Sequence, residues 1–315
     1  MSGKADLSIS PDTRARVLAA AQELGYAPNS AAQALRSGKT GLIGFWMCLS
    51  YSRYRSMVLD GMRRILAPTD LALAVADVDE DYAWHHSFTR ALRIPVEGVI
   101  AFDMSTAGEA FAQDSARLAP NLPYVSMGAY WSAARSHVGV DLRTGAEMAV
   151  EHLLETGRRR IAYVTTHDSD EVVEAGRFAG YVTAINTAGL EPRRLEVSPL
   201  STERIASIQR TLAECLHEGT LPDALLCMFD DIAVDAVEAL LRLGLRPGKE
   251  IALVGFNGTE GTERGPCPIT VVRQPIETMC ALAFEFLQAQ IADPRAPVGK
   301  RVLTPELVVR ASSSA

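Results

Sequence analysis

The sequence predicts an α/β protein with two doubly wound, parallel-sheet subdomains around a cleft, preceded by a partial helical headpiece and a hinge helix. Beyond residue 41, apolar runs of strand length alternate with segments of helix length. The strand-like runs are continuously apolar, which is typical of parallel sheets covered by helices on both faces. The alternation falls into two successive series. Two such sheets imply a ligand cleft beyond the carboxyl ends of their strands.

The first series begins at Leu42 and the second at His137. In the first series we expect strands at 42–48, 71–76, 98–102 and 123–127, joined by helices at 53–67, 82–93 and 107–118. In the second series we expect strands at 137–140, 161–165, 195–197, 223–228 and 250–255, joined by helices at 144–155, 175–188, 201–217 and 231–243.

Before these series, one helix is expected from Pro11 to about Leu24. Ser10 can cap it, Pro11 suits the first helical position, and Gly25 can end it. One face of this helix is apolar and consists of Val17, Ala20, Ala21 and Leu24. A single apolar stripe needs a partner helix. We therefore expect the residues up to about 28 to be part of a small helical domain.

The stretch from Tyr26 to Gly44 has the pattern of a hinge. Asn29 suits a helix N-cap, and the following residues up to Arg36 favour a helix until Gly38 ends it. A helix of about two turns is too short to be stable alone, because roughly 12–15 residues are needed in water. We expect this helix to form conditionally.

Charge is distributed unevenly along the 315 residues, whose net charge is −7. Residues 1–39 carry a charge of +2 and the remainder −9. This asymmetry favours an anionic partner for the head, although a solvated helix surface explains it as well. The five cysteines show no C-x-x-C pairing and are expected in the core of a protein from a reducing compartment. No signal peptide or membrane span is visible, so we expect a cytoplasmic protein.

Four segments resemble the effector domain of the lac repressor/galactose repressor family of bacterial transcription regulators. They are VGVDLRTGAEMAVEHLLETGRRRIAYVT (138–165), GRFAGYVTAINTAGL (176–190), PDALLCMFDDIAVDAVEALLRLGLRPGKEIALVGFNG (222–258) and ITVVRQPIETM (269–279). The head, SISPDTRARVLAAAQELGYAPNSAAQALRSGKTGLIG, resembles the same family's third headpiece helix and hinge helix. The resemblance implies a type I periplasmic-binding-protein-like body. It also implies a homodimer that holds or releases operator DNA when a small molecule occupies the cleft.

The resemblance implies four regions of the chain. They are a partial DNA-binding headpiece at 1–28, a hinge helix and linker at 29–41, an N-terminal effector subdomain at 42–164 plus 276–298, and a C-terminal effector subdomain at 165–275 plus 299–311. Family members begin with a helix-turn-helix that reads the major groove, and the N-terminal part of this unit is not visible here. A start further upstream, a shortened chain and a loss of specific DNA reading remain open. The sequence as it stands is expected to bind operator-like DNA weakly and with little sequence preference.

Within the hinge, Leu35 matches the family position that wedges into the minor groove. The residues placed to contact the groove or phosphates around it are Asn29, Ala32, Arg36 and Lys39. The alternative is that Leu35 packs against its symmetry mate or the body. For the dimer contact, the resemblance implies helices at about 53–67 and 276–291.

In the cleft, Arg177 matches the family arginine of the GR-x-x-G segment, whose guanidinium fork can hold hydroxyls, carbonyls or a carboxylate. Asn257 stands where the family usually has aspartate, and Phe229 where it usually has asparagine. Asp230 and Asp141 match family acids that are expected mainly to fix strand-to-helix turns. Further candidates match or neighbour cleft positions, with core or loop packing as the alternative: Thr144, Ser50, Leu200, Tyr130 and Trp131.

The aspartate-to-asparagine change bears on the effector. Asn257 keeps an acceptor but removes a negative charge, so the Arg177 cation is less compensated. Among a sugar, sugar acid, phosphorylated sugar or purine-like molecule, this favours an effector with a carboxylate, a phosphate or an acceptor-rich ring over a simple neutral aldose. Phe229 would offer an apolar wall.

The sequence contains no G-x-S-x-G elbow, P-loop or G-x-G-x-x-G opening a helix, so we expect neither an enzyme nor a bound cofactor. His85 and His86 are adjacent on an expected helix and point in different directions, so no metal site is expected there. The alternative to a transcription regulator is a small-molecule-binding protein of the same fold without specific DNA binding. The hinge favours the regulator.

Overall fold

The computed structural model describes residues 10–25, 34, 36–48, 52–78, 90–103, 119–128, 135–166 and 171–314. The chain forms two compact units, Met1–Gly41 and Leu42–Ala315. Most of the expected helix 82–93 and all of the expected helix 107–118 lie outside the described residues. The two units are considered separately below.

The first unit contains the expected helix, α1 (Pro11–Glu23). The backbone N–H of Thr13 donates to the hydroxyl of Ser10 at 3.3 Å, which confirms Ser10 as the cap. On the expected apolar face, Val17 and Leu24 are 59% and 81% exposed. Further on, the N–H of Gly38 donates to Ala34 O at 2.8 Å, and its φ of 70° is a conformation that favours glycine. The hinge helix therefore ends at Gly38, as expected.

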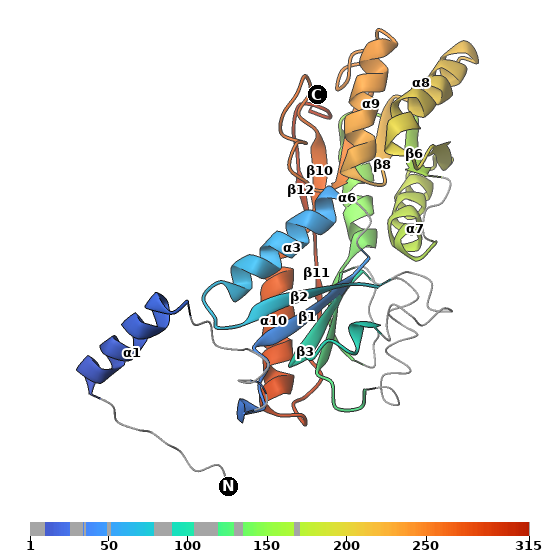
Figure 1. Ribbon diagram of the computed structural model, residues 1–315. Coiled ribbons are helices and arrows are strands. Elements are labelled where there is room, and N and C mark those ends of the chain that lie inside the picture. The colour runs from blue at the N-terminus through green and yellow to red at the C-terminus, as the bar shows by residue number, and fades with distance from the viewer. Residues whose placement is uncertain are drawn as a thin grey trace. The chain divides into compact units, whose positions relative to one another are not determined.

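The second unit contains two six-stranded sheets, and the first has the order β11-β5-β4-β3-β1-β2. Its strands are β1 (Leu42–Met47), β2 (Ala72–Asp77), β3 (Gly98–Phe102), β4 (Tyr124–Gly128), β5 (Ser136–Val140) and β11 (Lys300–Leu303). All neighbours are parallel. The helices α3 (Arg53–Leu66) and α10 (Ile276–Ala292) pack against each other beside this sheet (Figure 1).

The second sheet has the order β12-β10-β9-β8-β6-β7. Its strands are β6 (Ile161–Thr166), β7 (Arg193–Val197), β8 (Ala224–Cys227), β9 (Ala252–Asn257), β10 (Thr270–Arg273) and β12 (Glu306–Val308). Only the β10–β12 pair of this sheet is antiparallel. Its helices are α6 (Leu142–Glu155), α7 (Glu171–Thr187), α8 (Ser201–His217) and α9 (Asp230–Arg242), which pack as the pairs α6–α7 and α8–α9.

The chain crosses between the two sheets three times, and two of the expected boundaries need correction. The first crossing follows β5, because α6 packs against α7, β8, β10 and β12 of the second sheet. The boundary therefore lies at about Asp141 and not at 164. The second crossing is at Gln274 and Pro275, as expected. The third lies between β11 and β12, so residues 300–303 belong to the first sheet and not to the second. The strand–helix rhythm is the same on both sides of each crossing, so periodicity cannot reveal these points.

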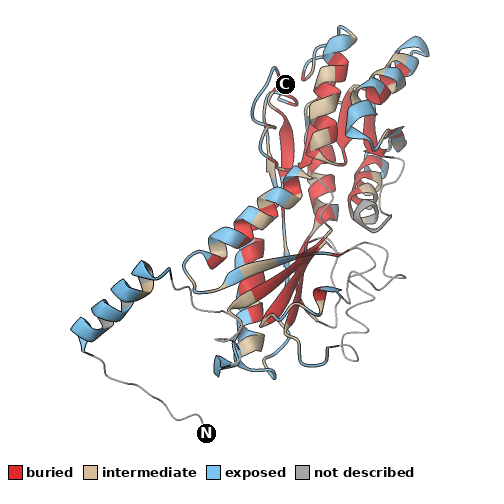
Figure 2. Cartoon of the chain, in the orientation of Figure 1, coloured by how far each residue is buried: buried red, intermediate tan, exposed pale blue. Residues whose placement is uncertain are grey.

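Burial follows the expected strand pattern. Strands β3, β4, β5, β6, β8 and β9 are buried along their whole length, as the red ribbons of Figure 2 show. Four of the five cysteines are buried, and all five are free. Among the described residues, no helix combines the length and the apolar character needed to cross a bilayer.

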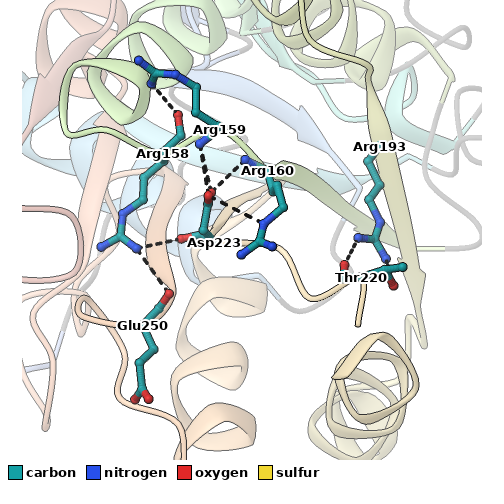
Figure 3. Close-up of polar contacts among 7 residues, drawn as sticks. All are labelled: Arg158, Arg159, Arg160, Arg193, Thr220, Asp223 and Glu250. Carbon is teal, nitrogen blue, oxygen red and sulfur yellow. Dashed lines mark hydrogen bonds and ion pairs between the residues drawn. The ribbon is translucent and has the colours of Figure 1, made fainter. Parts of the chain in front are cut away.

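The amino-terminal ends of β6, β8 and β9 are joined by the RRR segment at 158–160. The Arg158 guanidinium donates to the backbone carbonyls of Asp223, Gly248, Lys249 and Glu250 at 3.0–3.3 Å. The Asp223 carboxylate accepts the backbone N–H groups of Arg159 and Arg160, and Figure 3 shows these contacts together. Arg158 therefore ties three loops at the end of the sheet that lies away from the carboxyl ends of the strands.

Replacing Arg158 should destabilise this unit. We expect Arg158→Met to lower the free energy of unfolding by about 3 kcal/mol, because a charged donor to several carbonyls is lost. The matched control is Arg160→Met, whose Nε lies 3.9 Å from the Asp223 carboxylate on a 65% exposed side chain and should change stability by less than about 0.5 kcal/mol. Urea denaturation of both variants would measure the difference, and equal effects would contradict this role for Arg158.

Candidate functional site

Polar and aromatic side chains lie at the carboxyl ends of the strands of the two sheets. Asp103 follows β3, Phe229 follows β8, and Asn257 is the last residue of β9. Arg177 projects from α7, which follows β6. In each sheet, strand order reverses at the strands that lead into this region, β1 and β6. Parallel α/β sheets bind ligands at this position.

Arg177 is at the centre of this group and is only 2% exposed. Its Nη2 donates to Asn257 Oδ1 at 3.0 Å. Its guanidinium carbon lies 5.0 Å from the ring centroid of Phe229 and 4.5 Å from that of Phe256. Two aromatic faces thus stabilise the cation. The other two nitrogens, Nε and Nη1, have no hydrogen-bond acceptor among the residues that the structure describes.

The charge of Arg177 is stabilised only in part by its surroundings. Burial lowers the pKa of the guanidinium, while nearby Tyr163, Tyr54, Asp103 and Asp230 act in the opposite direction. Arginine stays protonated in proteins. The buried cation therefore benefits from any acceptor that reaches its two remaining N–H-bearing nitrogens.

The GR-x-x-G segment explains why Arg177 is held in this place. Arg177 lies in the second turn of α7, because the helix begins at Glu171 and not at 175 as expected. A Cβ at Gly180 would collide with Arg143 O and lie 3.0 Å from Ala146 Cβ. The glycine thus allows α7 to approach α6 closely. The aromatic rings of Phe178 and Tyr181 then anchor α7 on Tyr163.

Two residues of the site were missed by the sequence reasoning. The Gln274 side chain donates from Nε2 to Asn257 Oδ1 at 2.7 Å, and its Oε1 accepts from the hydroxyl of Tyr54, also at 2.7 Å. The Tyr54 ring lies 5.7 Å from that of Phe102. Burial, followed by the charge of Asp103, raises the pKa of Tyr54. Gln274 lies within the motif ITVVRQPIETM, which could have indicated it, whereas no sequence signal pointed to Tyr54.

Two non-glycine residues at this site have a positive φ, Asp103 at 42° and Asn257 at 113°. The conformation of Asn257 costs a non-glycine residue about 1–3 kcal/mol. Its side chain accepts from two donors, and its carbonyl accepts the N–H of Gln274 at 3.1 Å. These contacts hold the residue in place. Strained backbone of this kind is frequent at ligand sites.

Of the two acids expected to fix strand-to-helix turns, Asp141 does so, whereas Asp230 contacts the loop after β9. Asp141 caps α6 by accepting the N–H of Thr144 at 2.9 Å and its hydroxyl at 2.8 Å. Asp230, at the start of α9, accepts the N–H of Thr259 at 2.6 Å through Oδ2. Asp230 is 1% exposed, and its Oδ1 has no partner within the described part of the chain. Thr144 thus takes part in the cap of α6.

The remaining candidates are placed as follows. Leu200 directly precedes α8, is 56% exposed and is not part of the buried group around Arg177. Arg36 is helical and exposed, and Lys39 is exposed beyond Gly38. Six candidates lie outside the described residues: Ser50, Tyr130, Trp131, Asn29, Ala32 and Leu35.

One groove lies apart from the Arg177 side chain. It has a volume of about 980 Å³ and runs between α3, the segment that joins β9 to β10, and the start of α10. Charged side chains of both signs line it, including Arg53, Asp60, Arg64, Arg264, Arg273 and Glu277. A smaller groove of about 370 Å³ lies between α3 and the edge strand β2 and is mainly apolar. Both grooves flank α3, so they are candidates for protein contact rather than for the effector.

Asp230 should make stability depend on pH. Burial raises the pKa of its carboxyl from 3.8 to about 7, although the N–H of Thr259 opposes this shift. The folded state then binds a proton more tightly than the unfolded state, so stability falls as pH rises from about 4 to about 7 and levels off above. Between pH 5 and pH 8 we expect this residue to account for a loss of roughly 2–3 kcal/mol. Urea denaturation should show that Asp230→Asn, which cannot ionise, removes this part of the slope. An unchanged slope would contradict the assignment.

The comparisons with known proteins agree with this architecture. A family model described as a periplasmic binding protein-like domain matches residues 150–313. The ribose operon repressor of Haemophilus influenzae is 25% identical over 309 residues, which cover 96% of this chain and 90% of that protein. The HTH-type transcriptional repressor PurR of Aliivibrio salmonicida is 25% identical over 304 residues, which cover 95% and 90%.

The fold is also that of a solved regulator. The structure of the lac repressor dimer bound to operator and the anti-inducer ONPF aligns with a TM-score of 0.76 at 23% identity, covering 92% of this chain and all of that one. The family match spans more than half of the chain, and the relatives align over nearly its whole length. This chain therefore contains a periplasmic binding protein-like domain and belongs to the lac repressor/galactose repressor family of transcription regulators.

Proposed function

We propose that this protein is a ligand-responsive transcriptional repressor whose effector binds at Arg177, between the carboxyl ends of the two sheets. The relatives that align over its length are named as a ribose operon repressor and a transcriptional repressor. We assign it no catalytic step, because these relatives are repressors and its buried polar groups form a binding arrangement. DNA contact is proposed for the hinge, where Arg36 and Lys39 are exposed.

One observation carries the effector assignment. A buried guanidinium retains two nitrogens without an acceptor among the described residues, while its third nitrogen is held by Asn257. An effector that supplies a carboxylate, a phosphate or several ring acceptors would complete its hydrogen bonds. The rings of Phe229 and Phe256 would meet the apolar face of such a molecule. We therefore propose an acceptor-rich or anionic small molecule in preference to a simple neutral aldose.

A thermal-shift screen would test the effector class. The compounds are sugar acids, sugar phosphates, purines and neutral sugars. We expect the largest rise in Tm from an anionic or acceptor-rich compound and its loss in Arg177→Ala. The matched control is Arg194→Ala, because Arg194 also lies over an aromatic ring, that of Phe178, at 5.6 Å, and should respond like the wild type. A neutral pentose or hexose giving the largest rise would refute the charge argument, and a full response in Arg177→Ala would refute the role of the arginine.

The second partner we propose is another copy of the chain, bound through α3 and its neighbours. The small groove beside α3 is lined by Leu59, Leu66, Leu71, Leu73 and Val75, among others. Val75 is 38% exposed on an edge strand, where apolar residues and unpaired backbone groups favour association. The large groove on the other side of α3 carries cations and anions together, as a self-complementary two-fold contact requires. This supports the expected involvement of 53–67 and 276–291.

Light scattering at micromolar concentration should give the mass of a dimer. Val75→Asp should shift the protein toward monomer by at least tenfold in the dissociation constant, because the charge would be buried in the contact. The control is Leu216→Asp, which changes a similarly exposed apolar residue, 49% exposed on α8, and should leave the dimer intact. A monomeric wild type would count against the repressor mechanism, since paired half-sites require two headpieces.

A further inference from the structure

Four side chains form a continuous chain of hydrogen bonds from the second sheet to α3. Arg177 Nη2 donates to Asn257 Oδ1 at 3.0 Å, Gln274 Nε2 donates to the same oxygen at 2.7 Å, and the Tyr54 hydroxyl donates to Gln274 Oε1 at 2.7 Å. Each of the four is less than 9% exposed. Arg177 and Asn257 belong to elements of the second sheet, whereas Tyr54 is in the first turn of α3, beside the first sheet.

The direction of this hydrogen-bond chain is set at its arginine end. A guanidinium can only donate, so the Asn257 side chain must present its oxygen to Arg177. Gln274 can then reach that oxygen only through its NH₂ group, which turns its own oxygen toward Tyr54. Without Arg177, both amides could turn over, and the Tyr54 hydroxyl would have to accept instead of donate. The contact made by α3 therefore depends on a residue that does not touch it.

Gln274 can contact both Asn257 and Tyr54 because it lies where the chain crosses from the second sheet to the first. It follows β10 of the second sheet and precedes α10, which packs against α3. A second contact between α3 and the second sheet's helices is the ion pair of Arg53 with Asp231 at 3.5 Å. That pair is 45% and 34% exposed, so water and salt screen it and it contributes little. The buried hydrogen-bond chain is the stronger connection.

We propose that Gln274 is a positioning residue that couples the effector site at Arg177 to α3. The proposal rests on the proposed function. An effector acceptor that draws the guanidinium toward itself through Nε and Nη1 would weaken the contact of Nη2 with Asn257 that orients this amide, and the change passes through Gln274 to Tyr54 and the first turns of α3. These turns border both grooves proposed for the second copy of the chain. The effector thus acts on the dimer face without contacting it.

Hydrogen–deuterium exchange of the effector-free, full-length chain tests this coupling. The readout is the exchange rate of amides in residues 57–62 of α3. Arg177→Ala and Gln274→Met should each raise this rate about threefold or more, and the double variant should not exceed the larger single effect, because both interrupt one chain. Asn257→Asp should lower the rate, because a carboxylate accepts from Arg177 and Gln274 more strongly.

Two controls separate coupling from general loosening. Tyr181 lies one helical turn from Arg177. Its hydroxyl donates to Ile161 O and accepts from the Arg193 N–H, both at 2.8 Å, and Tyr181→Phe removes this hydroxyl. Arg242→Gln removes an exposed ion pair with Glu238, at 2.9 Å on α9. Both should leave residues 57–62 within twofold of the wild type. The proposal is overturned by an unchanged rate in Arg177→Ala, by an equal effect of Tyr181→Phe, or by additive effects in the double variant.

If Arg177→Ala does not fold, Asn257→Asp becomes the deciding variant. An exchange rate of amides 57–62 that is not lowered in Asn257→Asp overturns the proposal. Because no effector enters this measurement, its failure leaves the outcome of the thermal-shift screen intact. Failure of the screen, in turn, leaves the coupling measured here unaffected.

Discussion

A buried guanidinium needs acceptors for its donors and a favourable environment for its charge, and Arg177 imposes both needs on the middle of this molecule. The two aromatic rings beside it come from the ends of β8 and β9, and its acceptor comes from Asn257. The strained φ of Asn257 and the close approach of α7 at Gly180 serve this placement. Strain and close packing are tolerated here because together they hold one cation at the meeting point of two sheets.

The two ends of the second sheet differ in how far a guanidinium is supplied with hydrogen-bond acceptors. At the amino-terminal ends of its strands, the Arg158 guanidinium is saturated by four backbone carbonyls. At the carboxyl ends, Arg177 keeps donors that the described residues do not satisfy. Arg158 lies between α6 and β6, and Arg177 lies within α7. The supply of acceptors separates the structural role of Arg158 from the binding role proposed for Arg177. Residue type alone therefore does not identify the site.

Sequence patterns predicted the strands well, since a fully buried strand such as β3 or β8 reads as an unbroken apolar run. The motif around Arg177 also singled out this residue, which the structure buries beside Asn257. Tyr54 could not be, because its partner Gln274 lies 220 positions away and no local pattern records that contact. The sequence did not show that Thr144 also contacts Asp141 in the cap of α6. The crossings after β5 and β11 were misplaced because strand pairing, and not periodicity, decides sheet membership.

The three crossings between the sheets have a mechanical consequence. The parts of the unit around the two sheets, here called lobes, are joined by three chain connections. Three connections oppose sliding of one lobe past the other more than they oppose a rotation between the lobes. Gln274 lies at one of these crossings, and its side chain contacts Tyr54 on one side and Asn257 on the other. A change in the angle between the lobes would alter the distance from Gln274 to Tyr54 or to Asn257. The two hydrogen bonds of one amide thus register how the lobes are set against each other.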